Sequence, residues 1–372
     1  PLGKTENQMY TIFPDNTLHM GIAHMTIGEK ETPWENLFNL STTANKDRRP
    51  ALRLEKLEEQ AQYPLKGSEV AEPVNTKGMA DMVNQALERS IDKDITIYVH
   101  GYKVTFYNPV LVSAELWHYL GYEGSFISFS WPATPKTLAY FKDSASASFS
   151  GAALRKLLTM LADRTTVEHI NIIGYSAGTR MVVNALDQLN LLARFAPDPL
   201  KERYLRIGHV ILVGADADRD NFARILSEDL LDIVESFNIY VSNQDKALGF
   251  SNWLFGGQNR LGQAFDMSTV RSSGREFVAS NPKLRFINVT DAEASNAASG
   301  HGYFRQSPWV SGDILMTLRH DLSPARRGLV LNDEGPMWDF PPDYLTRIRM
   351  ALADLSLPPL AAARPRVADS RR

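Results

Sequence analysis

Residues 174–178 read Gly-Tyr-Ser-Ala-Gly and fit the pattern G-x-S-x-G, which is typical of a nucleophilic serine on a sharp turn. The pattern follows an apolar run at 169–173 and precedes a segment with apolar side chains at helical spacing. A strand, a tight turn and a helix in this order expose the serine hydroxyl at the end of the strand, and small flanking residues leave room for the turn. We therefore predict that Ser176 is a nucleophile.

A serine hydroxyl is a poor nucleophile at neutral pH, so Ser176 needs a histidine as general base and an acidic residue to orient it. On turns of this kind the chain order is serine, acid, histidine. Two histidines follow Ser176 beyond the last predicted strand: His301 lies in a glycine-flanked loop, and His320 ends a predicted helix. We predict His301 as the base, because a base on this kind of sheet belongs in the loop after the final strand. His320 stays the alternative, although a histidine at a helix C-terminus is commonly there for the helix dipole.

The acid is expected to follow a strand between Ser176 and His301. Asp245 lies three residues past the predicted strand at 237–242, and we favour it. The alternative is the group Asp216, Asp218 and Asp220, which follows the predicted strand at 209–213. That group also fits the acidic first turn of a helix, and it lacks the glycine and distal glutamate of a calcium loop. We therefore expect no metal site there.

An oxyanion hole needs two backbone N–H groups that point to the developing negative charge. We predict Ala177, directly after the nucleophile, and Tyr102, in the loop after the apolar run at 95–99. His100 precedes the nucleophile in the chain, so we expect it to be structural rather than basic. Substrate-binding aromatic side chains are expected in the segment after Asp245 and near the same sheet edge: Phe250, Trp253 and Phe255, with Trp131 and Tyr175.

The elements that must position these residues repeat along the chain as short apolar runs separated by helical segments. Strands are predicted at 95–99, 125–130, 169–173, 209–213, 237–242 and 284–289, and the clearest helices at 78–90, 108–120, 135–161 and 177–192. Short continuous apolar strands between helices indicate a doubly wound α/β fold, with a mostly parallel sheet covered on both faces.

Three parts are predicted along the chain. Residues 1–76 form an N-terminal extension packed on the core, residues 77–350 the catalytic domain, and residues 351–372, which include four Arg near the end, a partly disordered tail. Within the extension, 18–27 reads as a strand, and 50–62 is helical in composition.

The composition excludes several classes of protein. The 40 Lys and Arg against 43 Asp and Glu give a net charge of −3, which argues against a nucleic-acid or anionic-membrane partner. Cysteine is absent, which excludes disulfides, thiolate metal sites and a cysteine nucleophile. No apolar run is long enough to span a bilayer. The chain starts at Pro1, which is expected either after removal of an export signal or from a trimmed start, and export is slightly favoured. The sequence indicates no oligomeric state.

Together these motifs resemble the α/β-hydrolase superfamily, and most closely a branch of bacterial α/β hydrolases of unknown function. The resemblance rests on residues 98–102, 129–133, 174–180, 240–248 and 301–304 in this order, within roughly 77–344. The chain differs from the common pattern of the branch in two places. Lys103 stands where Asn is more usual, and the turn has Tyr-Ser-Ala rather than His-Ser-Met.

The resemblance implies the α/β-hydrolase fold with a Ser176–Asp245–His301 triad, and a serine hydrolase acting on a small carboxylic ester without a cofactor. An amidase or an acyltransferase with the same triad is the nearest rival. A non-catalytic α/β-hydrolase-fold binding module is a rival of another class. A complete triad argues against such a module, because loss of function usually removes one member.

Overall fold

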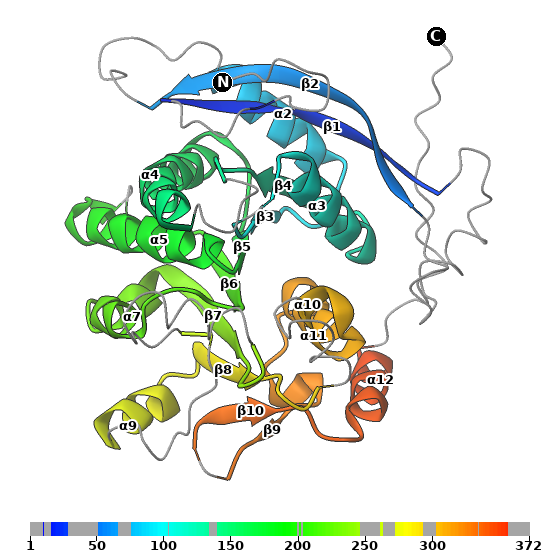
Figure 1. The fold of residues 1–372 in the computed structure, drawn as a ribbon, viewed down its shortest axis with the longest axis vertical. Coiled ribbons are helices and arrows are strands. Elements are labelled where there is room, and N and C mark those ends of the chain that lie inside the picture. The colour runs from blue at the N-terminus through cyan, green and yellow to red at the C-terminus, as the bar shows by residue number, and fades with distance from the viewer. Residues whose placement is uncertain are drawn as a thin grey trace.

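An eight-stranded sheet is the centre of the molecule in the computed structural model (Figure 1). The structure describes residues 10, 16–28, 51–65, 76–102, 104–133, 140–198, 201, 204–245, 261–262, 272–292, 303–333 and 335–355. The strand order is β4-β3-β5-β6-β7-β8-β10-β9, and the neighbours are parallel except for β9 and β10. The predicted doubly wound, mostly parallel sheet is confirmed.

All six strands predicted for the sheet are present, with ends shifted by up to three residues. They are β3 (Ile95–Val99), β4 (Ser125–Phe129), β5 (Ile170–Tyr175), β6 (Ile207–Val213), β7 (Val234–Val241) and β8 (Leu284–Asn288). Two short strands, β9 (Val330–Leu331) and β10 (Met337–Asp339), extend the sheet at one end. Their two and three residues are too few to give a period in the sequence.

Helices cover both faces of the sheet, as Figure 1 shows. One face carries α2 (Thr76–Glu88), α4 (Tyr140–Arg164), α5 (Gly178–Phe195), α7 (Arg219–Leu226) and α9 (Ser272–Ser280). The other carries α3 (Tyr107–Tyr119), α10 (Tyr303–Gln306), α11 (Pro308–His320) and α12 (Tyr344–Asp354). Strand β6 shows why its sequence is continuously apolar: Val210 and Leu212 join the core under the first face, Ile211 and Val213 that under the second.

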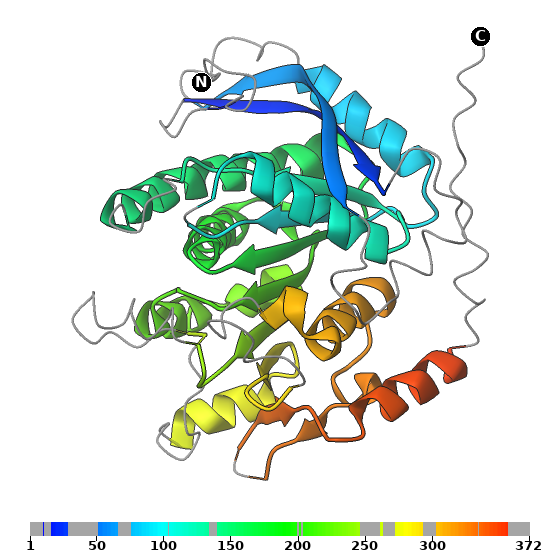
Figure 2. The ribbon, with the colours of Figure 1, turned by 45° about the vertical axis from the view of Figure 1, so that its right-hand side comes forward.

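A two-stranded antiparallel hairpin precedes this domain, formed by β1 (Thr17–Ile27) and β2 (Leu52–Pro64) (Figure 2). The helix expected at 50–62 is therefore wrong. Its Leu, Glu, Lys and Gln residues favour a helix locally, but pairing with β1 decides the conformation. Two register shifts, at Met20/Gly21 and His24/Met25, interrupt the pairing, so β2 lacks a regular alternation that would have revealed a strand.

The hairpin packs on the domain beside α2 and α3, and Ala61 of β2 joins the core. Tyr63 and Leu65 pack against the same core, and Lys156 of α4 donates a hydrogen bond to the Leu65 carbonyl oxygen at 2.5 Å. The boundaries at 76 and 350 stay predictions. Residues 356–372 of the predicted tail lie outside the described residues.

Candidate active site

Ser176 occupies the turn between β5 and α5 in a left-handed conformation, with φ at 53°. Its N–H donates to the Val213 carbonyl oxygen of β6 at 3.0 Å, and its own carbonyl oxygen accepts from the N–H of Thr179 at 3.0 Å. A left-handed non-glycine residue costs on the order of 1–3 kcal/mol and persists only where the surroundings enforce it. Here strand pairing on one side and the first turn of α5 on the other enforce it.

The start of α5 lies directly against the end of β3. A methyl group on Gly178 would overlap the His100 carbonyl oxygen and stand 2.7 Å from the Val99 carbonyl oxygen, so only glycine fits. This close approach brings the loop after β3 beside the nucleophile. A methyl group on Gly101 would lie 2.8 Å from Ser176 Cβ and 3.3 Å from Ser176 Oγ. Tyr102 follows Gly101 in the chain, and Ala177 follows Ser176. The two residues predicted to supply oxyanion N–H groups are therefore next to the two residues that meet here.

His100 and Trp131 brace this loop from within the protein. The Trp131 backbone N–H donates to His100 Nε2 at 3.1 Å, and the Trp131 indole N–H donates to the His100 carbonyl oxygen at 2.7 Å. His100 Nδ1 then carries the proton that is shared with the Gly101 carbonyl oxygen at 2.6 Å. Burial lowers the pKa of His100 to about 4, so this ring stays neutral at physiological pH. Both ring nitrogens are occupied, so His100 holds the loop in place.

Trp131, one of the residues predicted to bind substrate, packs in the core beside His100. It is 4% exposed, and its ring stacks on His100 with a centroid separation of 5.2 Å. Tyr175, half-buried before Ser176, lies against Phe304 with ring centroids 4.9 Å apart. The other expected pocket residues, Phe250, Trp253 and Phe255, lie outside the described residues.

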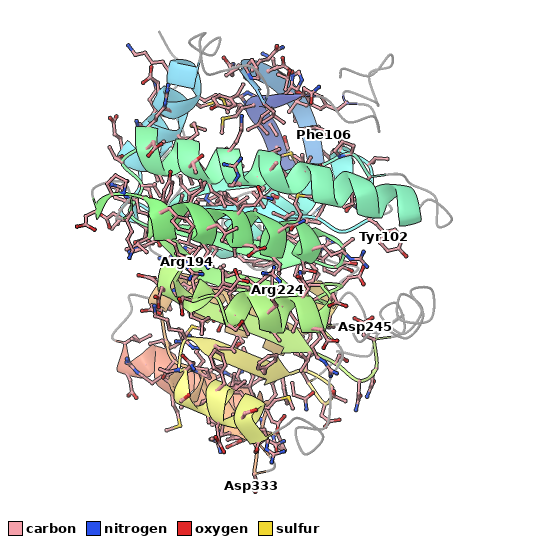
Figure 3. The ribbon with its side chains drawn as sticks, turned by 90° about the vertical axis from the view of Figure 1, so that its left-hand side faces the viewer. Tyr102, Phe106, Arg194, Arg224, Asp245 and Asp333 are labelled. Atoms are coloured by element: carbon pink, nitrogen blue, oxygen red, sulfur yellow. The ribbon has the colours of Figure 1, made fainter. Side chains whose placement is uncertain are left out.

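Asp245 lies at the carboxyl end of β7, on the same side of the molecule as Tyr102 (Figure 3). It is 5% exposed. Burial and then the negative charge of Asp245 raise the pKa of both the Tyr175 and the Tyr303 phenol. Strands β5, β6 and β7 are parallel neighbours, so Ser176 and Asp245 both follow the carboxyl ends of this part of the sheet.

The alternative acids have other partners. Asp216 Oδ2 lies 3.0 Å from Arg180 Nη2 of α5, and its backbone N–H donates to Thr179 Oγ1 at 3.0 Å. Asp218 caps α7 by accepting from the Asn221 N–H at 2.8 Å. The interpretation of this group as a helix start is confirmed for Asp218, the N-cap of α7, and for Asp220, which lies in its first turn. The Arg180 partner was missed, although Arg180 lies only two residues past the GYSAG pattern.

The predicted base, His301, lies outside the described residues. Its alternative, His320, ends α11 at the opposite edge of the sheet from Ser176. Asp321, the next residue, lies 3.4 Å from His209 Nε2, and His209 is near the start of β6. Ser176 instead follows the end of β5, beside the end of β6.

The residue that sequence reasoning missed most clearly is Tyr303, whose fully buried hydroxyl links the ends of β6 and β7. Its place two residues after His301 was the available signal.

No group of His, Asp and Glu able to hold a metal occurs within the described ranges. Likewise, no helix in the described part is both long and apolar enough to cross a membrane.

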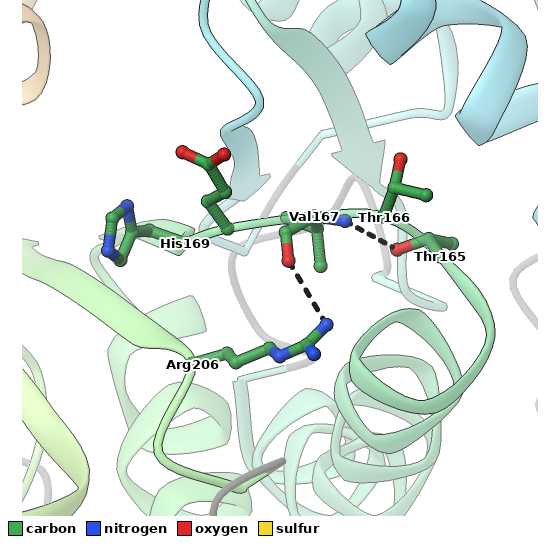
Figure 4. A pocket seen from close by; sticks show the side chains of 6 residues that line it. Thr165, Thr166, Val167, His169 and Arg206 are labelled. Atoms are coloured by element: carbon green, nitrogen blue, oxygen red, sulfur yellow. Dashed lines mark hydrogen bonds between the residues drawn. The ribbon is translucent and has the colours of Figure 1, made fainter.

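A surface hollow, shown in Figure 4, lies at the other edge of the sheet. Its lining consists of Thr165, Thr166, Val167, Glu168, His169 and Arg206. His169 immediately precedes β5 and Ser176 immediately follows it, so about 20 Å of strand separates the hollow from the nucleophile. Arg206 donates to the carbonyl oxygens of Ala162 and Val167, at 3.2 and 3.1 Å, and so serves the fold here.

A doubly wound sheet with a left-handed serine between its inner strand β5 and helix α5 defines the class of α/β hydrolases. A family model described as "Alpha/beta hydrolase of unknown function (DUF900)" matches residues 76–319, more than half of the chain. The protein belongs to this family. The hairpin of β1 and β2 precedes the matched region.

No curated protein matches the chain. Among solved structures, the chain is similar to one titled esterase B from Lactobacillus rhamnosis (HN001), with 13% sequence identity and a TM-score of 0.33. That alignment covers 83% of this chain and 86% of the other. A likeness this loose indicates nothing about the activity of the present chain.

Proposed function

We propose that the protein is a serine hydrolase of carboxylic esters. In this proposal Ser176 attacks the acyl carbon, His301 accepts the serine proton, and Asp245 orients the imidazole of His301. The backbone N–H groups of Tyr102 and Ala177 bind the oxyanion that forms on the acyl oxygen. No cofactor takes part.

The reaction has two halves. The C–O bond to the leaving alcohol breaks as His301 returns the proton to that oxygen, which leaves an acyl ester on Ser176. Water then attacks the acyl carbon while His301 takes a proton from it, and collapse of the second tetrahedral intermediate releases the acid and restores Ser176.

The observation that carries the proposal is the left-handed backbone of Ser176, which lies against Gly101. Strain at one serine is difficult to account for by packing alone, because a glycine there would remove it. The second observation is the buried carboxylate of Asp245 after the end of β7, which supplies the acid of the proposed triad. Asp216 pairs with Arg180, and Asp218 caps α7.

The test is turnover of 4-nitrophenyl esters of increasing acyl length, with 4-nitroanilides of the same acids alongside. We expect the esters to be hydrolysed and Ser176→Ala to lower kcat at least ~10³-fold. Ser113→Ala is the matched control, because Ser113 is buried and its hydroxyl has no hydrogen-bond partner among the described residues. Full activity in Ser176→Ala, or hydrolysis of the anilides alone, would contradict the proposal.

A further inference from the structure

We infer that Tyr303 is a positioning residue, which fixes the chain directly after His301 to the ends of β6 and β7, beside Asp245. The inference rests on the proposed function, since it assigns the residue that holds the base in register with the acid. It does not require Tyr303 to touch the substrate.

The Tyr303 hydroxyl forms two hydrogen bonds with backbone groups of neighbouring strands. It accepts from the Gly214 N–H, directly after β6, at 2.7 Å, and it donates to the Tyr240 carbonyl oxygen of β7 at 2.9 Å. The side chain is fully buried, so water cannot take over either bond. One backbone group directly follows β6 and the other lies in β7, and both strands end at the proposed catalytic edge.

The distance along the chain makes this anchor relevant to His301. Two residues of fully extended chain span at most ~7 Å, so the Cα of His301 lies within that reach of the Cα of Tyr303. The Tyr240 carbonyl oxygen that accepts from Tyr303 lies next to the last residue of β7, and Asp245 follows this strand end by four residues. In the proposed triad, fixing Tyr303 thus restrains the chain that carries His301.

Phe304 supplies a second anchor for the same helix, α10. It is 2% exposed, and its ring lies 4.9 Å from that of Tyr175 and 6.3 Å from that of Tyr98, measured between centroids. Tyr175 is covalently attached to Ser176. The short helix thus contacts the strand of the proposed nucleophile through one residue and the strand of the proposed acid through the other.

Strand β7, which Tyr303 contacts, is itself tied to helix α11 by hydrogen bonds of buried side chains. The Tyr240 hydroxyl donates to Asp313 Oδ2 of α11 at 2.6 Å, and Arg327 Nε donates to Asp313 Oδ1 at 2.6 Å. Asp313 and Arg327 are both fully buried. Because β7 cannot shift easily against α11, a bond from Tyr303 to its backbone defines a fixed point.

The test compares Tyr303→Phe with Tyr344→Phe. Tyr344 is also fully buried, but its hydroxyl has no hydrogen-bond partner in the described part of the chain. This control therefore removes a buried tyrosine hydroxyl without removing a hydrogen bond of the described structure. Since a misplacement of ~1 Å can lower a rate ~100-fold, we expect Tyr303→Phe to lower kcat by ~10- to 100-fold, with KM changed less than ~3-fold. Tyr344→Phe keeps the wild-type kcat.

A second readout follows the titration of the His301 ring by its Cε1–H NMR signal, assigned with His301→Asn. Loss of a nearby carboxylate lowers the pKa of an imidazole, so Asp245→Asn shifts the midpoint down. We expect Tyr303→Phe to shift it in the same direction and Tyr344→Phe to leave it unchanged. A shift in Asp245→Asn without one in Tyr303→Phe overturns the role of Tyr303 alone, whereas no shift in Asp245→Asn overturns the proposed triad as well.

If Tyr303→Phe does not fold, Phe304→Leu makes the same comparison through the second anchor. The smaller side chain loosens the contact with Tyr175 and keeps both hydrogen bonds of Tyr303. We expect a loss of kcat of ~3-fold or more, again at nearly constant KM, because the displacement is smaller. Wild-type kcat in a folded Phe304→Leu variant overturns the inference.

Discussion

Gly101 lies against Ser176 so closely that a methyl group on Gly101 would stand 2.8 Å from Ser176 Cβ. Real Cβ atoms do not approach one another this closely, so the loop after β3 and the turn after β5 can meet only at a glycine. The contact joins two segments that are far apart in the chain, and it supplies the geometry that an oxyanion hole beside the nucleophile requires.

Gly101→Ala is expected to displace this loop and to lower kcat ~10²-fold or more, comparable to the loss of one oxyanion donor. Gly312→Ala in α11 is the matched control. Among the described residues, a methyl group there would meet only Ile348 Cδ1, at 3.8 Å, and alanine stabilises a helix interior by roughly 0.5–1 kcal/mol relative to glycine. Steady-state kinetics on an ester and urea unfolding of both variants check the prediction. Wild-type kcat in Gly101→Ala would show that the loop has no such role.

Asp245→Asn is expected to lower kcat ~10⁴-fold with little change in stability, because an amide leaves the proposed imidazole in the wrong tautomer. Asp216→Asn is expected to do the reverse. It weakens the ion pair with Arg180, lowers the free energy of unfolding by roughly 1–3 kcal/mol and retains most of the activity. Measuring kcat and unfolding for both variants tests the assignment of the acid. If Asp216→Asn loses turnover while Asp245→Asn remains active, the two roles are exchanged.

Stability is expected to fall between about pH 6.5 and pH 4, partly because of His100. Burial holds its folded pKa at about 4, so the unfolded chain binds this proton first and is favoured as the pH falls. Between pH 7 and pH 5, protonation of His100 in the unfolded chain lowers the free energy of unfolding by about 2 kcal/mol.

Replacement with His100→Gln isolates that contribution. Glutamine can keep one donor and one acceptor near Gly101 and Trp131 but does not titrate in this range. Urea unfolding at pH 7 and pH 5 is expected to show a smaller loss of stability in the variant than in the wild type. The same loss in both proteins would show that His100 is not the group responsible. His209, also buried with a pKa lowered to about 4, contributes to the loss in both proteins.

The sheet and the nucleophile could be predicted because their signals are local. Residues 95–99 are β-branched or aromatic over the whole length of β3, and GYSAG identifies the turn without reference to any other segment. Residues 50–62 show the opposite case. Their composition favours a helix, but β2 forms through pairing with β1, a contact between segments separated by a long connection.

The partners within the site could not be predicted, for a related reason. The ion pair of Asp216 depends on Arg180, which reaches Asp216 from α5 only once the helix has packed on the sheet. Trp131 looks like a pocket residue in the sequence, because an aromatic after a strand suits a binding site. Its stacking on His100, which places it in the core, becomes visible only in three dimensions.

The proposal depends above all on Ser176 being an activated nucleophile. The most direct measurement is covalent labelling with a fluorophosphonate, followed by peptide mass spectrometry to locate the adduct. We expect the folded wild type to carry one phosphonyl group, on Ser176, and heat-denatured protein and Ser176→Ala to carry none. A folded wild type that does not label, an adduct on another residue, or equal labelling of Ser176→Ala would contradict the account.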